Sequence, residues 1–294
     1  MVRLLLWSLL CFGVAGNLLA QMPPQCPSNN YPAADLCSDI CIYCNFNGYS
    51  GSSAGYTSQT PPGGFCGTIE NEQWLGFIAG ASSATFTVTP SNCQNGNGLQ
   101  IALYSSCTSS YIACNGGSSG NGNNPVSITA SLTPGVNYYL LIDGFAGDVC
   151  NFTVTVTPPT AVQAPPIAPP GAIQGPATIC PGGTVTFRIP PVNGAGAYEW
   201  NAPAGWLING QAPPVTTNAP GGNVVTVTAG PTGGQICVRP FNSCNSGNQI
   251  CRTINVQPIP PTNLPQAIVC NEDAPYTLPW GQQVSTSGTY QHTY

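Results

Sequence analysis

Short runs in which apolar and polar residues alternate recur along the chain. One side of such a run is apolar and the other polar, which is the period-two pattern of a strand with one buried face. The runs lie at residues 85–88, 127–130, 152–156, 184–187 and 223–228. Gly, Pro and Asn separate them, and no segment carries a sustained helical period. The sequence therefore predicts an all-β protein built from tandem β-sandwich modules.

Two proline-rich stretches divide the predicted strands into modules. Residues 158–172 and the stretch from Pro258 to Pro265 have the composition of semi-rigid spacers. They predict a Cys-rich β-sandwich at 26–157, a second sandwich at 173–257, and a remnant at 266–294. The remnant offers two strands, at 276–281 and 287–290, which are too few to bury both faces of a sheet. We expect it to be the incomplete start of a third β module, with Cys270 unpaired.

The first residues predict export. Arg3 provides a positive charge, residues 4–10 are mostly apolar, and Leu18–Leu19–Ala20 provides a small-residue exit. This is the pattern of a secretory signal peptide over residues 1–20. The apolar part is too short to span a bilayer, and no later segment reaches the required length. We expect a secreted or cell-surface protein without membrane insertion of the mature chain.

Charge is scarce and restricts the partners. Only 4% of the residues are charged, the formal net charge is −5, and lysine is absent. Nucleic-acid binding needs clustered Lys and Arg to neutralise phosphates, so a nucleic-acid partner is not expected. The expected partner is an extracellular polysaccharide or protein surface.

An exported chain meets oxidising conditions, so its cysteines predict disulfides. The first module holds nine, an odd number, and Cys26 is the candidate for the unpaired one. Cys107 and Cys114 are close enough in sequence to close one hairpin loop. In the second module we expect Cys237 to pair with Cys251 across a hairpin and Cys180 with Cys244. The nearest alternative joins Cys180 to Cys237.

The spacing Cys37-x3-Cys41-x2-Cys44 matches the iron–sulfur signature of radical S-adenosylmethionine enzymes. A cluster would need reduced thiolates in an α/β barrel, whereas this segment follows an export signal in a β-type sequence. Structural disulfides are therefore the favoured interpretation. Zinc is disfavoured because His292 is the only histidine of the sequence.

The residues needed for catalysis are nearly missing. Without lysine, and without histidine in the first two modules, the usual ways to activate a nucleophile are lost. No catalytic residue is predicted. Glu70 and Glu72 would face one side of a strand before Trp74, and Asp143 and Asp148 lie in a glycine turn after an apolar strand. These four are candidate Ca²⁺ or ligand contacts. The alternatives are a solvated loop for the glutamates and an Asp-stabilised turn for the aspartates.

Several segments of the first module carry a family resemblance. They are Gly48–Gly51, Phe65–Gly67, Glu72–Phe77, Gly98–Tyr104 and Gly135–Gly144. The module resembles the amino-terminal β-sandwich of very large secreted surface proteins of gliding and related Gram-negative bacteria. It is also loosely similar to pre-peptidase C-terminal and CUB-like jelly rolls. Trp74, Phe77, Tyr138 and Tyr139 are expected in the core instead of forming a sugar platform.

The second module is similar to the PKD-like (polycystic-kidney-disease-type) repeats of the same surface proteins. The matching segments are Ile179–Gly182, Tyr198–Trp200, Pro203–Trp206 and Ile236–Val238. The resemblance implies a seven-stranded Ig-like sandwich, export by the type IX system and work as an adhesin or stalk. Tyr198–Asn201 lacks the Asp-Gly signature of PKD domains proper, so no precise ligand is carried over.

The sequence thus predicts a non-catalytic extracellular adhesion or spacer protein, not an enzyme, with no cofactor except a Ca²⁺ ion at the four carboxylates. The alternative is a pair of accessory modules, binding carbohydrate or Ca²⁺, within a larger secreted enzyme.

Overall fold

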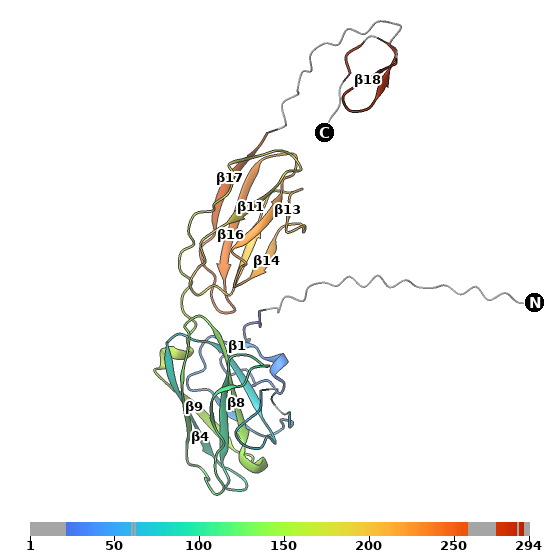
Figure 1. The fold of residues 1–294 in the computed structure, drawn as a ribbon. Helices are drawn as coiled ribbons and strands as arrows, with labels where there is room; N and C mark the ends of the chain where they lie inside the picture. The colour runs from blue at the N-terminus through green and yellow to red at the C-terminus, as the bar shows by residue number, and fades with distance from the viewer. Residues whose placement is uncertain (1–21, 60, 62, 258–274, 287, 291–294) are drawn as a thin grey trace, which may run out of the picture. The chain divides into compact units, whose positions relative to one another are not determined.

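The computed structural model describes residues 22–59, 61, 63–257, 275–286 and 288–290. The predicted signal peptide and Cys270 lie outside these residues. The chain divides into a unit that ends at Gln257 and a second unit that begins at Pro258. The first unit contains two β-sandwiches, coloured blue to green and yellow to orange in Figure 1. The all-β prediction is confirmed.

The first sandwich is built from nine strands in two sheets. The strands are β1 Ile42–Tyr43, β2 Ser50–Ser52, β3 Gln73–Ile78, β4 Ser83–Ser91, β5 Leu99–Tyr104, β6 Tyr111–Asn115, β7 Val126–Ser131, β8 Asn137–Gly144 and β9 Asn151–Thr157. Their orders are β1-β3-β8-β5-β6 and β2-β9-β4-β7. Without β1, these are two interleaved four-stranded sheets in the strand order of a jelly roll. β1 adds a parallel strand beside β3.

The two sheets differ in how they are buried. In β4, β7 and β9, buried and more exposed residues alternate, as their sequences predict. Strands β3 and β5 are buried at every position because both faces of their sheet are covered. The inner face packs in the sandwich core, and Trp74, Ala102 and Leu141 lie in a second apolar cluster with Ile40 and Phe65. The amino-terminal segment is held there by paired backbone bonds between Ala34 and Trp74, of 2.9 and 3.0 Å.

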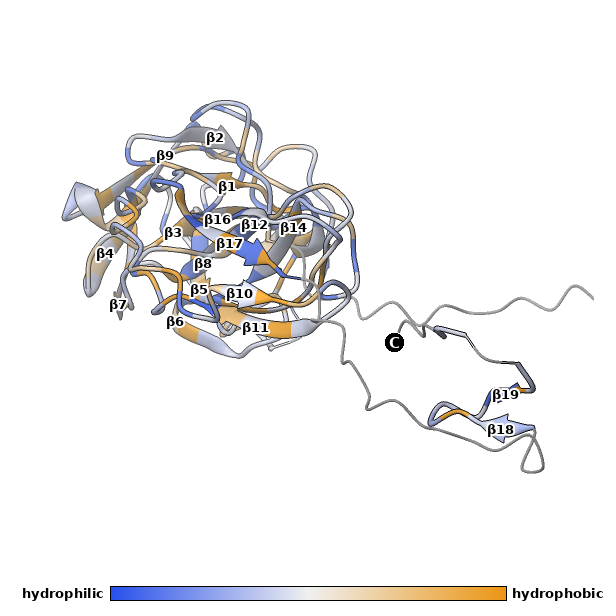
Figure 2. Cartoon of the chain, turned by 90° about the horizontal axis from the view of Figure 1, so that it is seen from above, coloured by the Kyte–Doolittle hydropathy of each residue, from blue (hydrophilic) through white to orange (hydrophobic). Residues whose placement is uncertain are grey.

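The second sandwich has eight described strands. They are β10 Thr178–Ile179, β11 Thr184–Arg188, β12 Ala197–Asn201, β13 Leu207–Ile208, β14 Val215–Asn218, β15 Val224–Thr228, β16 Gly234–Phe241 and β17 Ile250–Val256. They form the sheets β10-β17-β16-β12-β14 and β11-β15-β13. This is an Ig-like arrangement with one strand more than the seven implied by the resemblance. Orange and pale residues alternate along β11 in Figure 2, as the core between the sheets requires.

Residues 158–172, predicted to be a linker, pack against both sandwiches. Pro159–Val162 forms a short 3-10 helix, η3, whose Ala161 and Val162 are fully buried in the first core. Ile167 and Ala168 pack against the second core. The segment is therefore anchored by apolar side chains in place of running through solvent as a spacer.

Six disulfides connect twelve of the thirteen described cysteines. They are Cys26–Cys41, Cys37–Cys107, Cys44–Cys244, Cys66–Cys114, Cys93–Cys150 and Cys237–Cys251. The bond Cys237–Cys251 was predicted, and its residues lie directly opposite each other on β16 and β17. The cysteines of the iron–sulfur-like spacing bond to three different partners, as the disulfide interpretation expects.

Two predicted features of the first module are wrong. Cys107 does not bond to Cys114, because Cys107 lies in the turn after β5 whereas Cys114 lies three residues along β6 beyond Tyr111. At about 3.3 Å per residue, that distance exceeds the reach of a disulfide. Cys26 is not unpaired either. The cysteine without a partner inside its own module is Cys44, which bonds to Cys244 of the second sandwich.

The predicted bond between Cys180 and Cys244 is also wrong. Cys180 follows β10, whose Ile179 pairs with Val256 at the end of β17, and it is exposed and free. Cys244 precedes the start of β17 at Ile250. The length of β17, roughly 20 Å, therefore separates the two cysteines.

The second unit is described only in part. Its β18, Tyr276–Thr277, pairs with β19, Gln283–Val284, in an antiparallel hairpin. The first strand lies within the predicted 276–281, whereas the second comes earlier than the predicted 287–290. The turn is closed by a 2.8 Å bond from the Leu278 N–H to the Gln282 carbonyl.

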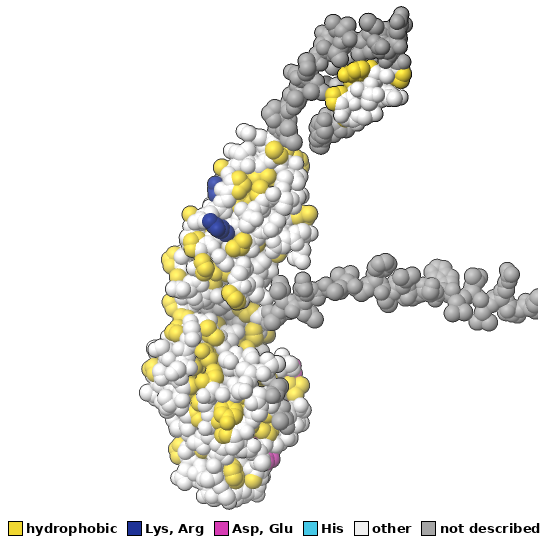
Figure 3. All heavy atoms as spheres, in the orientation of Figure 1, with side chains coloured by type: hydrophobic (Ala, Val, Ile, Leu, Met, Phe, Trp, Pro, Cys, Tyr) yellow, Lys and Arg dark blue, Asp and Glu magenta, His cyan; other side chains and the backbone are white. Residues whose placement is uncertain are grey.

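Within the described residues, every helix is too short or too polar to cross a bilayer. The surface carries little charge. In Figure 3, polar side chains and backbone, drawn white, cover most of the visible face between scattered apolar patches. This agrees with a composition that is 4% charged.

Candidate functional site

Three adjacent strands of the first sandwich carry polar residues at one end of their sheet. Gln100 of β5 lies directly opposite Asp143 of β8. Glu72 immediately precedes β3, and since Gln73 pairs with Ile142, the next step of the same register brings Glu72 opposite Asp143. Laterally paired residues point to the same side of a sheet. Glu72, Asp143 and Gln100 thus form a polar row, next to the apolar row Trp74, Leu141 and Ala102.

A covering segment, described at residues 57–59, 61 and 63–71, lies over the polar row: its Thr68 carbonyl accepts a bond from Gln100, and its Glu70 and Asn71 N–H groups donate to Asp143. A disulfide from Cys66 to Cys114 ties it to β6, and the Tyr104 hydroxyl donates a 2.7 Å bond to the Gly64 carbonyl. Its start is fixed by Asp35, which accepts bonds of 2.7 and 2.8 Å from the backbone and side chain of Thr57. All three members of the row are 0% exposed as a result.

Glu72 is the least satisfied member. Neither of its carboxylate oxygens accepts a hydrogen bond from a described residue. Burial raises the pKa of Glu72 to about 7, and the nearby charges of Asp143 and Asp35 add to this rise. The backbone N–H groups of Gln59 and of Glu72 itself face the carboxylate and offset part of the rise without reaching hydrogen-bond geometry. A buried carboxylate without donors is costly unless something neutralises it.

Asp143 is better supported. Its Oδ1 accepts bonds from the backbone N–H groups of Asn71, at 2.7 Å, and Glu70, at 3.2 Å. Its Oδ2 accepts a bond from the side-chain amide of Gln100. Burial nevertheless raises the pKa of Asp143 to about 6, with a further contribution from the charge of Glu70, because these donors offset only part of the desolvation.

Asp148 is not a member of the polar row and instead binds the backbone of a nearby turn. Its carboxylate accepts backbone bonds from Asn95, Asn97 and Gly98, of 2.7, 2.6 and 2.9 Å. Burial would raise the pKa of Asp148, but these donors outweigh it and hold the pKa below its usual value. Asp148 therefore organises the turn at residues 94–98 and is not a member of the polar row that contains Asp143, and a cation shared by these two aspartates stays a prediction.

Of the four predicted carboxylates, Glu72 and Asp143 belong to the polar row and Glu70 lies beside it. Glu70 contributes a buried oxygen, Oε2, that has no partner among the described residues. Asp148 also lies near Cys93 and Cys150, but those sulfurs are joined in a disulfide and are not available as metal ligands. Gln100 was not predicted, because a glutamine in an apolar strand carries no signal until strand pairing places it beside Asp143.

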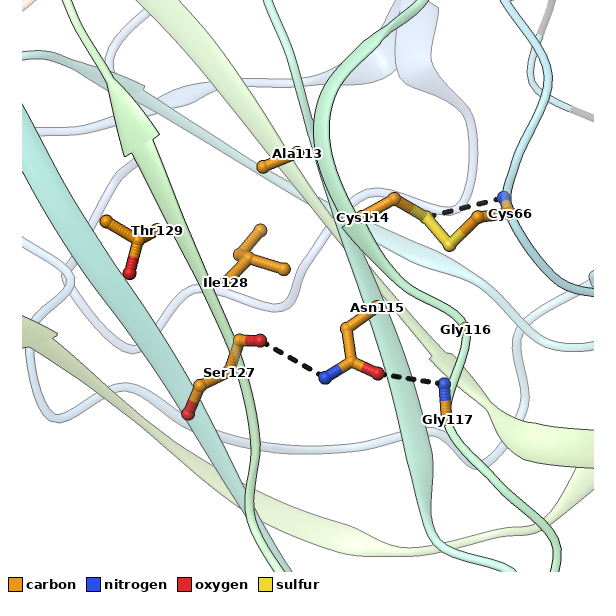
Figure 4. Close-up of a pocket in the computed structure, with 9 residues that line it drawn as sticks. All are labelled: Cys66, Ala113, Cys114, Asn115, Gly116, Gly117, Ser127, Ile128 and Thr129. Atoms are coloured by element: carbon orange, nitrogen blue, oxygen red, sulfur yellow. Dashed lines mark hydrogen bonds between the residues drawn. A yellow bond between two sulfur atoms is a disulfide. The ribbon is translucent and has the colours of Figure 1, made fainter.

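A second feature is an open groove between the edge strands β6 and β7, shown in Figure 4. Ala113, Ile128 and the Cys66–Cys114 disulfide line it. The Asn115 amide spans the gap, donating to the Ser127 carbonyl at 3.1 Å and accepting from the Gly117 N–H at 3.1 Å. No lining residue is ionisable, so the groove can offer hydrogen bonds and apolar contact but no acid–base chemistry.

The aromatic residues that could have formed a sugar platform are mostly internal. Trp74, Phe77 and Tyr138 are buried, and Tyr139 packs against the outer apolar cluster. The prediction that they belong to the core is confirmed.

Comparison with known protein families finds a match for the second sandwich. The profile of the PKD-like domain family matches residues 165–256, which covers the whole described sandwich and the end of the preceding segment. The match confirms the resemblance of this module. The chain matches no curated protein.

Three similar solved structures are remote in sequence from this chain. A β-1,2-glucanase from Parabacteroides distasonis has 12% identity over 80% of this chain, with a TM-score of 0.22. The adhesin domain of Epf from Streptococcus pyogenes has 11% identity over 64% of this chain and 72% of its own, with a TM-score of 0.26. Murine CEACAM1b has 14% identity over 65% of this chain and 94% of its own, with a TM-score of 0.24. The chain spans 40% of the length of the glucanase.

Proposed function

We propose that this protein is a non-catalytic adhesion or spacer protein of the cell exterior, built to carry tension between its ends. The observation that supports this most strongly is the disulfide Cys44–Cys244, which joins the two sandwiches across a sequence separation of 200 residues. A local bridge would only stabilise one module. This one connects a residue near the beginning of the first sandwich to a residue near the end of the second.

The pattern of bridges gives tension a covalent route. A pull between residue 22 and residue 257 passes through Cys26–Cys41, along three residues to Cys44, through Cys44–Cys244 and on to β17. Both cores lie almost entirely in the bypassed segment between Cys44 and Cys244. Apart from those of β1 and β17, which lie on the route, the hydrogen bonds and apolar contacts of the two cores are then not loaded, which suits a module held between a cell and a surface.

Single-molecule stretching of the full chain tests the proposal. We compare the wild type with a Cys44→Ser, Cys244→Ser double variant, and use Cys237→Ser, Cys251→Ser as the control, since that local bridge lies outside the tension route. In the double variant the remaining bridges still bypass most of the first sandwich, so the newly loaded segment is mainly the ~90 residues between Cys150 and Cys237. At about 3.4 Å per residue, this segment should add an extension on the order of 30 nm. The wild type and the control should not show this extension.

An equal extension for the wild type and the double variant would contradict the proposal. The same wild-type molecules, stretched before and after addition of a reductant, give a second measurement that does not depend on folding of the double variant. Because the reductant opens all six bridges, an extension larger than that of the double variant should appear, and only after reduction.

The proposed partner is a polysaccharide or protein surface recognised through hydrogen bonds. A surface with so few charges favours such contacts over ion pairing, and the groove between β6 and β7 offers backbone groups of two edge strands. Calorimetry of the protein with a panel of extracellular glycans checks this, with Asn115→Ala as the variant. Lost binding in the variant would assign the groove as the contact site.

A further inference from the structure

Among the described residues, the first sandwich has no cationic side chain that could neutralise the polar row. The sequence between residues 22 and 187 contains no lysine, arginine or histidine, and Arg188, Arg239 and Arg252 all belong to the second sandwich. Glu72 and Asp143 are 0% exposed, and Glu70 lies beside them. Carboxylates gathered in this way repel one another, and water does not reach them to screen the repulsion.

Several oxygens around the row are buried and have no partner in the part of the chain that the structure describes. They are both carboxylate oxygens of Glu72, Oε2 of Glu70 and Oε1 of Gln100. Gln100 is an independent indication of a ligand, because it is neutral and its amide is already fixed within the row by donating to Asp143 and to the Thr68 carbonyl. Most buried polar atoms in folded proteins have a partner. We therefore expect a bound ligand to interact with these unpartnered oxygens.

We propose that Glu72, Asp143 and Gln100 hold a Ca²⁺ ion beneath the covering segment. A hard divalent cation takes carboxylate and amide oxygens as ligands, which are the atoms that lack partners here. Zinc does not suit the site, because there is no histidine in the module and its cysteines are in disulfides. Mg²⁺ usually keeps several waters, whereas the ligands of this row are fully buried.

The covering segment explains how the ion is retained. The Cys66–Cys114 bridge and the Asp35–Thr57 bonds fix this segment at two points over the row. The backbone N–H groups of Glu70 and Asn71 bind Oδ1 of Asp143, which leaves Oδ2 directed toward Gln100. The ion would thus link the ends of β3, β5 and β8 to their cover. This site is independent of the tension route proposed above.

The test uses the full chain after dialysis against a chelator, followed by readdition of Ca²⁺ at pH 7.5. Elemental analysis should find about one tightly held Ca²⁺ per chain, and Tb³⁺ added in place of Ca²⁺ should luminesce on excitation of Trp74, two residues from Glu72. The melting temperature of the first sandwich should rise by at least ~5 °C with Ca²⁺, as expected for a ligand that binds only the folded state.

Glu72→Gln keeps the shape of the side chain and removes its charge, so it should weaken Ca²⁺ binding by at least 100-fold and abolish the melting shift. Glu199→Gln, which makes the same change in the second sandwich, should bind as the wild type does. Absence of bound Ca²⁺ and of Tb³⁺ luminescence in the wild type at millimolar ion would overturn the proposal, whatever the fate of the variants. So would a Glu72→Gln protein that binds normally.

Discussion

The two sandwiches of this chain reach stability by different means. The first has four internal disulfides, a sheet covered on both faces and a row of buried polar side chains. The second has one internal disulfide and a core centred on Trp200 and Trp206, whose indole N–H groups each bind a backbone carbonyl at 2.9 Å. The first module thus combines covalent bridges with buried polar groups, while the second depends mainly on apolar packing.

The largest effect should come from the second core. Trp200 is 0% exposed and belongs to the cluster between the two sheets. Trp200→Ala should lower the free energy of unfolding of this sandwich by about 3–5 kcal/mol, through lost apolar contact and the cavity left behind. Urea unfolding followed by hydrogen-exchange mass spectrometry should show the loss in residues 173–257 and not in residues 42–157. A loss below about 1 kcal/mol would show that packing does not dominate here.

The disulfides should matter more in the first sandwich than in the second. Cys93–Cys150 closes a loop with a sequence separation of 57, against 14 for Cys237–Cys251. Restriction of the unfolded chain then contributes about 4 and about 3 kcal/mol, respectively. Double Cys→Ser variants compared by denaturant unfolding should preserve this order. If the shorter bridge proves the more costly to remove, strain or packing governs the bridges instead of loop length.

The strands could be predicted from sequence because their signal is local. Alternation of Val, Ile and Phe with Thr, Ser and other polar residues identifies β4, β7, β9, β11 and β15. The disulfide partners could not be predicted in the same way. Cys107 and Cys114 are neighbours in the chain, but the direction of β6 carries them apart, and Cys44 finds its partner in another module.

The candidate site shows the same limit. Glu70, Glu72 and Asp143 are visible in the sequence as carboxylates at strand ends. Their association, the exclusion of Asp148 and the part of Gln100 all depend on the pairing of β3, β8 and β5, which brings together residues that are far apart in sequence. The sequence already shows that no basic residue lies between residues 22 and 187. This absence matters because Glu72 and Asp143 are buried, and their burial is seen only in the structure.

Asp148 should give the first sandwich an acid-sensitive element. Its carboxylate accepts three backbone N–H bonds, which hold its pKa below the ordinary 3.8. A lowered pKa means that the unfolded chain binds the proton more readily, so this stabilisation is present above about pH 4 and is lost as the pH falls through the folded value. Asp148→Asn should cost about 2 kcal/mol at pH 7.

Unfolding free energies of the wild type and Asp148→Asn, measured from pH 2 to pH 7, should converge at the acid end. Curves that stay parallel over the whole range would mean that the side chain acts through its shape and not through its charge.

The smallest effect should come from the one ion pair within the described residues, Arg239–Glu199 on the second sandwich. The nitrogen Nη2 and the oxygen Oε1 are 2.9 Å apart, but the side chains are 41% and 36% exposed. The residues lie directly opposite each other on β16 and β12, so the pair is well placed but screened by solvent. Glu199→Gln should change the free energy of unfolding by about 0.5 kcal/mol or less, and 1 M salt should remove the difference. Denaturant unfolding at low and high salt checks both statements. A loss above ~1.5 kcal/mol that persists in high salt would show that polar interactions support the second sandwich as well, and the contrast between the two modules would then no longer hold.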